Sequence, residues 1–113
     1  MTLNEIVSAL QLKVLAGRPD AQSAVTGGYA ADLLSCVMAR ARAGSVWVTL
    51  QAHVNVVAVA SLLGLAGVII TEGAQPDTAT CQKAEAEGVV LLSTRETTFA
   101  VVAALARLGV EAA

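Results

Sequence analysis

Hydrophobic residues fall into short runs that recur at nearly constant spacing along the chain. Four runs end in threonine, at residues 24–26, 46–49, 68–71 and 91–94, and successive threonines are 23, 22 and 23 residues apart. Each run is followed by a polar or glycine-containing turn and then by a segment of helical character. A strand, a turn and a helix of about 10–14 residues occupy such a stretch, so the pattern predicts β–α units and a mainly parallel sheet.

Helix signals mark the segments between these runs. Thr2 and Glu5 have capping-box spacing, which predicts a first helix to about residue 10. Further helices are expected at residues 29–42, 54–63, 76–88 and 96–108, and residues 12–15 predict an additional strand. The expected fold is a single layered α/β domain over residues 1–113, with helices flanking a mainly parallel sheet of four to five strands. Four units in a chain of this length favour one twisted sheet over a solenoid.

Composition limits the partners that the chain can have. Hydrophobic residues make up 56% of it and charged residues 14%, against about 25% charged residues in an average soluble domain. So little charge suggests that another subunit covers part of the surface, and we expect a homo-oligomer. The net charge is -2 without a cluster of Lys or Arg, which argues against a nucleic-acid polymer as partner.

Hydropathy and cysteine content indicate where in the cell the protein is expected. The most apolar run, residues 56–70, is shorter than the roughly 20 residues of a membrane-spanning helix, and glycines divide it. The start of the chain has no basic segment and no long apolar run, so we expect neither a signal peptide nor a membrane partner. Cys36 and Cys81 match no metal-ligand spacing and are interpreted as free thiols of a cytoplasmic protein.

Candidate chemistry gathers in the four turns. Ligands of open parallel sheets bind at the carboxyl ends of the strands, where all four turns are expected to meet. Besides Asp32, Thr49, Asp77 and Glu96 in these turns, the candidate ligand-binding residues are Thr26, Gly27, Gly28, Tyr29, Gln51, His53, Asn55, Thr71, Glu72, Gly73, Thr94 and Arg95.

Two adjacent glycines are the most conspicuous of these candidates. Gly27 and Gly28 precede an expected helix, where free N–H groups favour an anion, but a tight turn that needs positive φ is the simpler interpretation. Neither the dinucleotide-binding nor the P-loop glycine pattern is present. Asp32 and Asp77 stand near helix starts, where carboxylates have structural roles, and both disfavour bare phosphate unless a cation or ribose hydroxyl takes part.

The remaining reactive side chains support binding better than catalysis. His53 is the only histidine, and it either contacts a ligand, acts as a base or is simply exposed. One hypothesis is an enzyme that uses His53 with Asp32 or Glu72, but no nucleophile–base pair and no metal-ligand spacing supports it. We therefore expect no catalytic residue, metal or cofactor. Arg95 pairs either with an anionic ligand or with Glu72.

Aromatic residues are few. Trp47 and Phe99 are expected to anchor the core, whereas Tyr29, beside the two glycines, is the aromatic residue placed to touch a ligand.

Three glycine-containing stretches resemble a known family. The crossing at residues 26–28, the stretch 66–77 and the stretch 87–99 are similar to DRTGG domains over about residues 13–109. The resemblance implies the fold of the N-terminal domain of HPr kinase/phosphorylase, dimers, and a cytoplasmic regulatory module found beside CBS domains and in phosphotransacetylase-like and cobyrinate-synthase-like proteins. It implies no known ligand. Ala24 and Val25 replace the Asp-Arg of the family motif.

These observations lead to two functional hypotheses. The first is a regulatory, ligand-sensing module that binds a small anionic metabolite or nucleotide at the carboxyl edge of the sheet. The alternative is a structural or interaction protein that docks on a partner enzyme through an apolar face.

Overall fold

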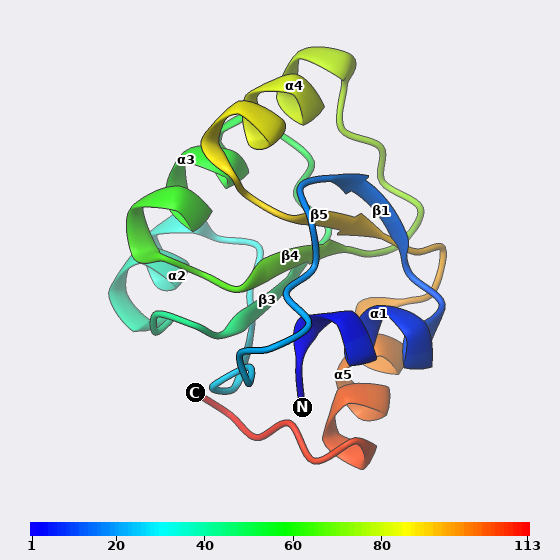
Figure 1. The fold of residues 1–113 in the computed structure, drawn as a ribbon. Coiled ribbons are helices and arrows are strands. Elements are labelled where there is room, and N and C mark those ends of the chain that lie inside the picture. The colour runs from blue at the N-terminus through cyan, green and yellow to red at the C-terminus, as the bar shows by residue number, and fades with distance from the viewer.

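The computed structural model describes all 113 residues and has three layers, with helices on both faces of one five-stranded sheet (Figure 1). The elements, in chain order, are α1 (Leu3–Leu10), β1 (Lys13–Ala16), β2 (Gly28–Ala30), α2 (Leu34–Arg40), β3 (Val46–Thr49), α3 (Asn55–Leu63), β4 (Gly67–Ile70), α4 (Thr78–Glu87), β5 (Leu91–Ser93) and α5 (Thr98–Arg107). The expected α/β fold is confirmed. None of the five helices is long and apolar enough to cross a bilayer.

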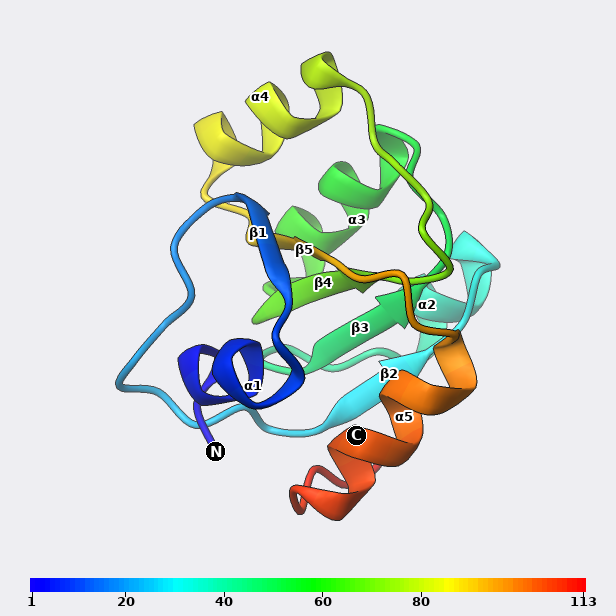
Figure 2. The same ribbon diagram turned by 90° about the vertical axis from the view of Figure 1, so that its right-hand side faces the viewer.

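The sheet has the strand order β1-β5-β4-β3-β2. Strands β2 to β5 are parallel and follow one another in a single direction, while β1 pairs antiparallel with β5. Because these crossovers all step the same way, the helices that make them, α2, α3 and α4, lie on one face of the sheet. The two helices outside these crossovers, α1 and α5, lie on the other face (Figures 1 and 2). The helices before and after β5 therefore lie on opposite faces.

The core has two halves, because side chains alternate along each buried strand. In β3, Trp47 faces α2, α3 and α4, whereas Val46 and Val48 face α1 and α5. Trp47 is fully buried, and its indole N–H donates a hydrogen bond to the carbonyl oxygen of Ala31 at 2.9 Å. This confirms the expectation that Trp47 is a core anchor.

Helix ends follow the local sequence signals. The capping box of Thr2 and Glu5 opens α1, and the hydrogen bond from the Thr2 backbone N–H is the main reason that the pKa of Glu5 lies below its ordinary value. Asp77 caps α4 by accepting a hydrogen bond from the Thr80 N–H at 2.8 Å. Gly88 ends α4 in the left-handed conformation, as its position just past the helical segment predicts.

Residues 24–30 differ from the expectation. The run at 24–26 is not part of the sheet, and the strand begins only at Gly28. The cause is long-range pairing, because Val25 N donates to the carbonyl oxygen of Met1 at 2.7 Å and Thr26 N donates to that of Gly44 at 2.9 Å. The helix expected at residues 29–42 is correspondingly short, since α2 covers only Leu34–Arg40.

Phe99 is a second correction. Its side chain is 85% exposed on the outer face of α5, so it is not a core anchor.

Candidate ligand-binding edge of the sheet

Three of the predicted threonine turns meet at the carboxyl ends of β3, β4 and β5. Thr49 and Thr71 are fully buried there, and Thr94 is half-buried. The hydroxyl oxygen of Thr49 accepts a hydrogen bond from Gln51 N at 3.1 Å, and that of Thr94 accepts one from Glu96 N at 3.2 Å. These two hydroxyls therefore shape the turns that follow their strands.

The turn after β2 is linked to the turn after β3 through Asp32. One oxygen of the Asp32 carboxylate accepts hydrogen bonds from the Thr49 hydroxyl and from Leu50 N, both at 2.9 Å. The Gln51 side-chain amide donates to the Asp32 carbonyl oxygen at 3.2 Å. Asp32 thus holds two neighbouring turns together, a role that sequence reasoning missed because its partners lie 17 to 19 residues away.

The turns after β4 and β5 are also hydrogen-bonded to each other, although their helices leave toward opposite faces of the sheet. Glu72 N donates to the Glu96 carbonyl oxygen at 2.8 Å, and Gly73 N donates to that of Thr94 at 3.1 Å. The Glu72 carboxylate accepts a hydrogen bond from Thr98 N at 2.8 Å, at the first residue of α5. Glu72 therefore satisfies a free N–H of that helix and stabilises its positive end.

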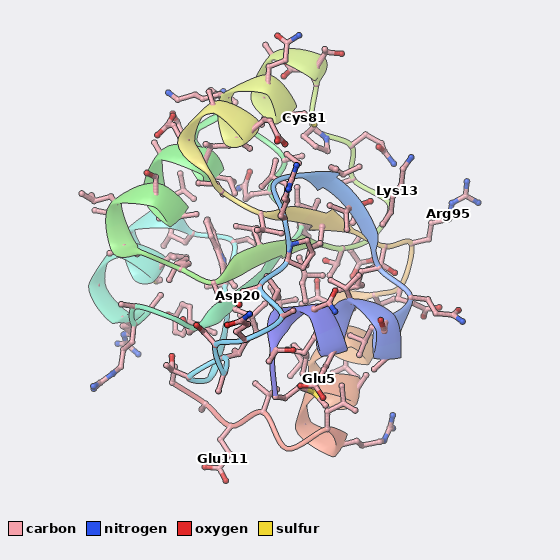
Figure 3. The ribbon with its side chains drawn as sticks, in the orientation of Figure 1. Glu5, Lys13, Asp20, Cys81, Arg95 and Glu111 are labelled. Atoms are coloured by element: carbon pink, nitrogen blue, oxygen red, sulfur yellow. The ribbon has the colours of Figure 1, made fainter.

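The structure excludes one of the two partners expected for Arg95. Within the chain the only ion pair joins Lys83 to Glu87, so Arg95 does not pair with Glu72. Arg95 is exposed and projects away from the body of the protein beside the end of β5 (Figure 3). Its guanidinium group is free to contact a ligand at this edge.

His53 lies in the turn between β3 and α3. Its Nδ1 accepts a hydrogen bond from Asn55 N at 3.2 Å, and its ring is exposed. Hydrogen bonds from Thr80 are the main cause of the lowered pKa of Asp77, and the charge of His53 adds a smaller lowering. The structure has no group of three or more His, Cys, Asp or Glu side chains that could hold a metal ion.

The predicted position of Thr26, Gly27 and Gly28 is wrong. Gly28 pairs with Val46, the first residue of β3, so these three residues lie at the amino edge of the sheet, opposite the other turns. A strand follows the glycines instead of a helix, so they do not form a helix N-terminus for an anion.

The two glycines lie against the end of the chain instead. Gly28 N donates to the Glu111 carbonyl oxygen at 2.8 Å, and Ala113 N donates to the Gly28 carbonyl oxygen at 3.0 Å. A Cβ atom on Gly27 would stand only 2.8 Å from the Ala113 side chain. The glycines therefore admit a second extended segment at the edge of β2.

Tyr29 is also displaced from its expected place, because it lies within β2 instead of in a turn. Its ring packs against the core half that faces α2, and its hydroxyl donates a long hydrogen bond of 3.4 Å to the Cys36 carbonyl oxygen.

A groove that sequence reasoning missed adjoins the carboxyl end of β5. It has a volume of about 370 Å³ and lies between the end of α1 and α5, with Thr94 and Glu96 at its rim. The sequence signal that would have revealed it is the pair Ala100 and Ala104, four residues apart on one helix face.

Comparisons with known proteins agree with this fold. No curated protein matches the chain. Among solved structures, the chain is similar to the CBS and DRTGG domains of the regulatory region of Clostridium perfringens pyrophosphatase, complexed with the activator diadenosine tetraphosphate. The TM-score is 0.70 at 14% sequence identity, and the likeness covers 92% of this chain but only 45% of that one. The model of the DRTGG domain matches residues 5–108, and the chain therefore belongs to the DRTGG domain family.

Proposed function

We propose that this chain is a non-catalytic regulatory module that senses a small anionic metabolite or nucleotide. The observation that carries the proposal is the match of residues 5–108 to the DRTGG domain. It is supported by the likeness in fold to a pyrophosphatase regulatory region that was crystallised with a nucleotide activator. Two free thiols, Cys36 and Cys81, fit the cytoplasm as its compartment.

The ligand-binding edge of this proposal is the carboxyl edge of the sheet. Arg95 has no carboxylate partner within the chain, and the His53 ring, in the turn after β3, is exposed, so both have donors for an anion. The exposed carboxylates of Asp77 and Glu96 repel bare phosphate, but they accept hydrogen bonds from hydroxyl groups. A nucleotide, which carries both phosphate and ribose hydroxyls, fits this mixture better than an inorganic anion. Thr26, Gly27 and Gly28 have no part in this site.

Native mass spectrometry of gently purified protein is the first experiment, because it identifies any ligand that co-purifies. A thermal-shift panel with diadenosine tetraphosphate, ATP, AMP and inorganic phosphate at millimolar concentration follows. Saturable stabilisation by at least one nucleotide, larger than that by phosphate, supports the proposal. If no compound co-purifies and none in a broad metabolite panel raises the melting temperature, the proposal is wrong.

Charge-neutralising variants locate the site. Arg95→Gln removes a charged donor from the edge, and because Arg95 is exposed, binding is expected to weaken by about two- to fivefold. Arg18→Gln is the matched control, because Arg18 is equally exposed but follows β1 at the opposite edge. Equal affinities of the two variants would place the ligand elsewhere.

A second proposal, for the protein as an interaction module, rests on the outer face of α5. Phe99 is 85% exposed and Val102 is 41% exposed, and they stand three residues apart on one side of the helix. Val102 also lines a groove of about 300 Å³ beside Ala30, at the edge strand β2. Exposed apolar side chains that cluster in this way mark protein contacts, and we propose that this face joins two copies into a homodimer.

Sedimentation velocity tests the homodimer. Phe99→Asp is expected to shift the protein to monomers that remain folded. Leu62→Asp is the control, since Leu62 is 71% exposed on α3, on the other face of the sheet. A wild-type protein that stays monomeric at high micromolar concentration contradicts the homodimer, and stoichiometric co-purification of an enzyme favours docking on a partner enzyme instead.

A further inference from the structure

The regulatory proposal assigns no ligand to the groove between α1 and α5. Both helices lie on the same face of the sheet (Figure 2), and the groove opens where the end of α1 approaches α5. Seven of its ten lining residues are hydrophobic. Its volume of about 370 Å³ lies within the range of small-molecule sites, which are about 300–1,000 Å³.

Small side chains create this space. Ala100 and Ala104 stand four residues apart on α5, so they form one stripe along the floor of the groove. Their methyl groups leave volume that a larger side chain would fill. Leu10 and Leu12, at the end of α1 and in the turn after it, provide apolar walls.

Charged groups stand at the two ends of the groove. Arg107 lines it at the last turn of α5 and is exposed, and its guanidinium group forms no ion pair within the chain. Glu96 lies beyond the other end of the same helix. The ten residues of α5 rise by about 15 Å, so Arg107 and Glu96 join the backbone at opposite ends of this helix.

We propose that this groove is a binding site for an elongated amphipathic anion, an aliphatic carboxylate. Its head group pairs with the Arg107 guanidinium, which binds carboxylates through two parallel N–H donors. Its chain lies along Ala104 and Ala100 and is covered by Leu10 and Leu12, which removes apolar surface from water. The site rests on its own residues and does not depend on nucleotide binding at the sheet edge.

Decanoate, below its micellar concentration, is the probe. Titration into ¹⁵N-labelled protein is expected to shift the amide signals of Leu12, Ala100 and Ala104 saturably. Decylammonium, which has the same chain and the opposite charge, is expected to produce these shifts only at several-fold higher concentration. Equal binding of both compounds would overturn the proposed role of Arg107, and shifts that do not saturate would overturn the site.

Two kinds of variant separate the groove from general stickiness. Ala104→Leu fills the floor and is expected to weaken decanoate binding at least tenfold, while Ala86→Leu, at an exposed position of α4, leaves it unchanged. Arg107→Gln is expected to weaken binding about two- to fivefold, in line with an exposed charge pair, whereas Arg95→Gln has no effect.

The variants also guard against loss of folding. A melting curve and an amide spectrum establish whether Ala104→Leu is folded. If it is not, Arg107→Glu tests the site instead, because substitution of an exposed residue leaves the core intact. Wild-type affinity in folded Ala104→Leu, or in Arg107→Glu, overturns the proposal. Nucleotide binding measured on the same variants is expected to stay at the wild-type level, so failure of either proposal is recognised independently.

Discussion

Replacing each of the two adjacent glycines by alanine tests what the Thr-Gly-Gly stretch does. A Cβ atom on Gly27 would stand 2.8 Å from the Ala113 side chain and 3.0 Å from the Glu111 carbonyl oxygen. A Cβ atom on Gly28 meets nothing closer than Val110, at 3.4 Å, which is ordinary contact. Neither glycine has a positive φ, so the two substitutions differ in the space available and not in backbone strain.

The expected magnitude follows from the pairing that Gly27→Ala disturbs. Moving the end of the chain away breaks the hydrogen bonds from Gly28 N to Glu111 and from Ala113 N to Gly28. Each backbone hydrogen bond contributes about 0.5–1.5 kcal/mol net, so Gly27→Ala is expected to lower the free energy of unfolding by about 1–3 kcal/mol. Gly28→Ala is expected to be neutral or stabilising by up to about 1 kcal/mol, because alanine restricts the unfolded chain.

Chemical denaturation followed by circular dichroism measures both free energies, and amide signals of residues 111–113 report the pairing directly. Removing residues 111–113 is expected to reproduce the loss in Gly27→Ala, and combining both changes is expected to add little further. If Gly27→Ala is as stable as wild type and keeps the signals of these residues in place, the packing argument is wrong. Loss of nucleotide binding without loss of stability would instead return Gly27 to the ligand site.

Three further predictions concern the core, the sheet edge and pH. Trp47→Phe is expected to lose about 2–4 kcal/mol in urea unfolding, because it removes buried volume and leaves the Ala31 carbonyl oxygen without its donor. Thr71→Val is expected to lower the free energy of unfolding by about 1–2 kcal/mol, since the Thr71 and Thr98 hydroxyl oxygens lie 2.6 Å apart. When Thr98→Val is combined with it, the loss is expected to be smaller than the sum of the two single losses. The lowered pKa of Asp77 stabilises the fold above the ordinary value of 3.8, and this contribution disappears as the pH falls through the folded-state pKa. The stability difference between wild type and Asp77→Asn, measured by urea unfolding from pH 6 to pH 2.5, is therefore expected to shrink below about pH 4.

Elements whose signals are local could be predicted from the sequence. The buried runs of β3 and β4, the capping box of Thr2 and Glu5, and the boundaries of α4 at Asp77 and Gly88 all agree with the structure. Each depends on residues within a few positions of one another. Periodicity and end signals are sufficient for such elements.

Features that depend on distant partners could not be predicted. Residues 24–26 look like a strand, but the start of the chain pairs with them and moves the strand to Gly28. Phe99 fits an apolar helix face, yet it lies on the side of α5 that no other element covers.

The candidate site shows the same division. Topology alone placed the turns after β3, β4 and β5 at one edge, because parallel strands end together. The Asp32 carboxylate joins two turns, and the Glu72 carboxylate binds the start of α5. Their hydrogen-bond partners lie 17 to 26 residues away, which no local pattern indicates.

Titration of ¹⁵N-labelled protein with diadenosine tetraphosphate and with its mononucleotides tests the central claim most directly. The account predicts saturable shifts of the amide signals of His53, Gly73 and Arg95, at the carboxyl edge of the sheet, and a weaker affinity in Arg95→Gln but not in Arg18→Gln. Saturable shifts confined to Gly27 and Gly28 at the amino edge, or the absence of any saturable shift, would contradict it.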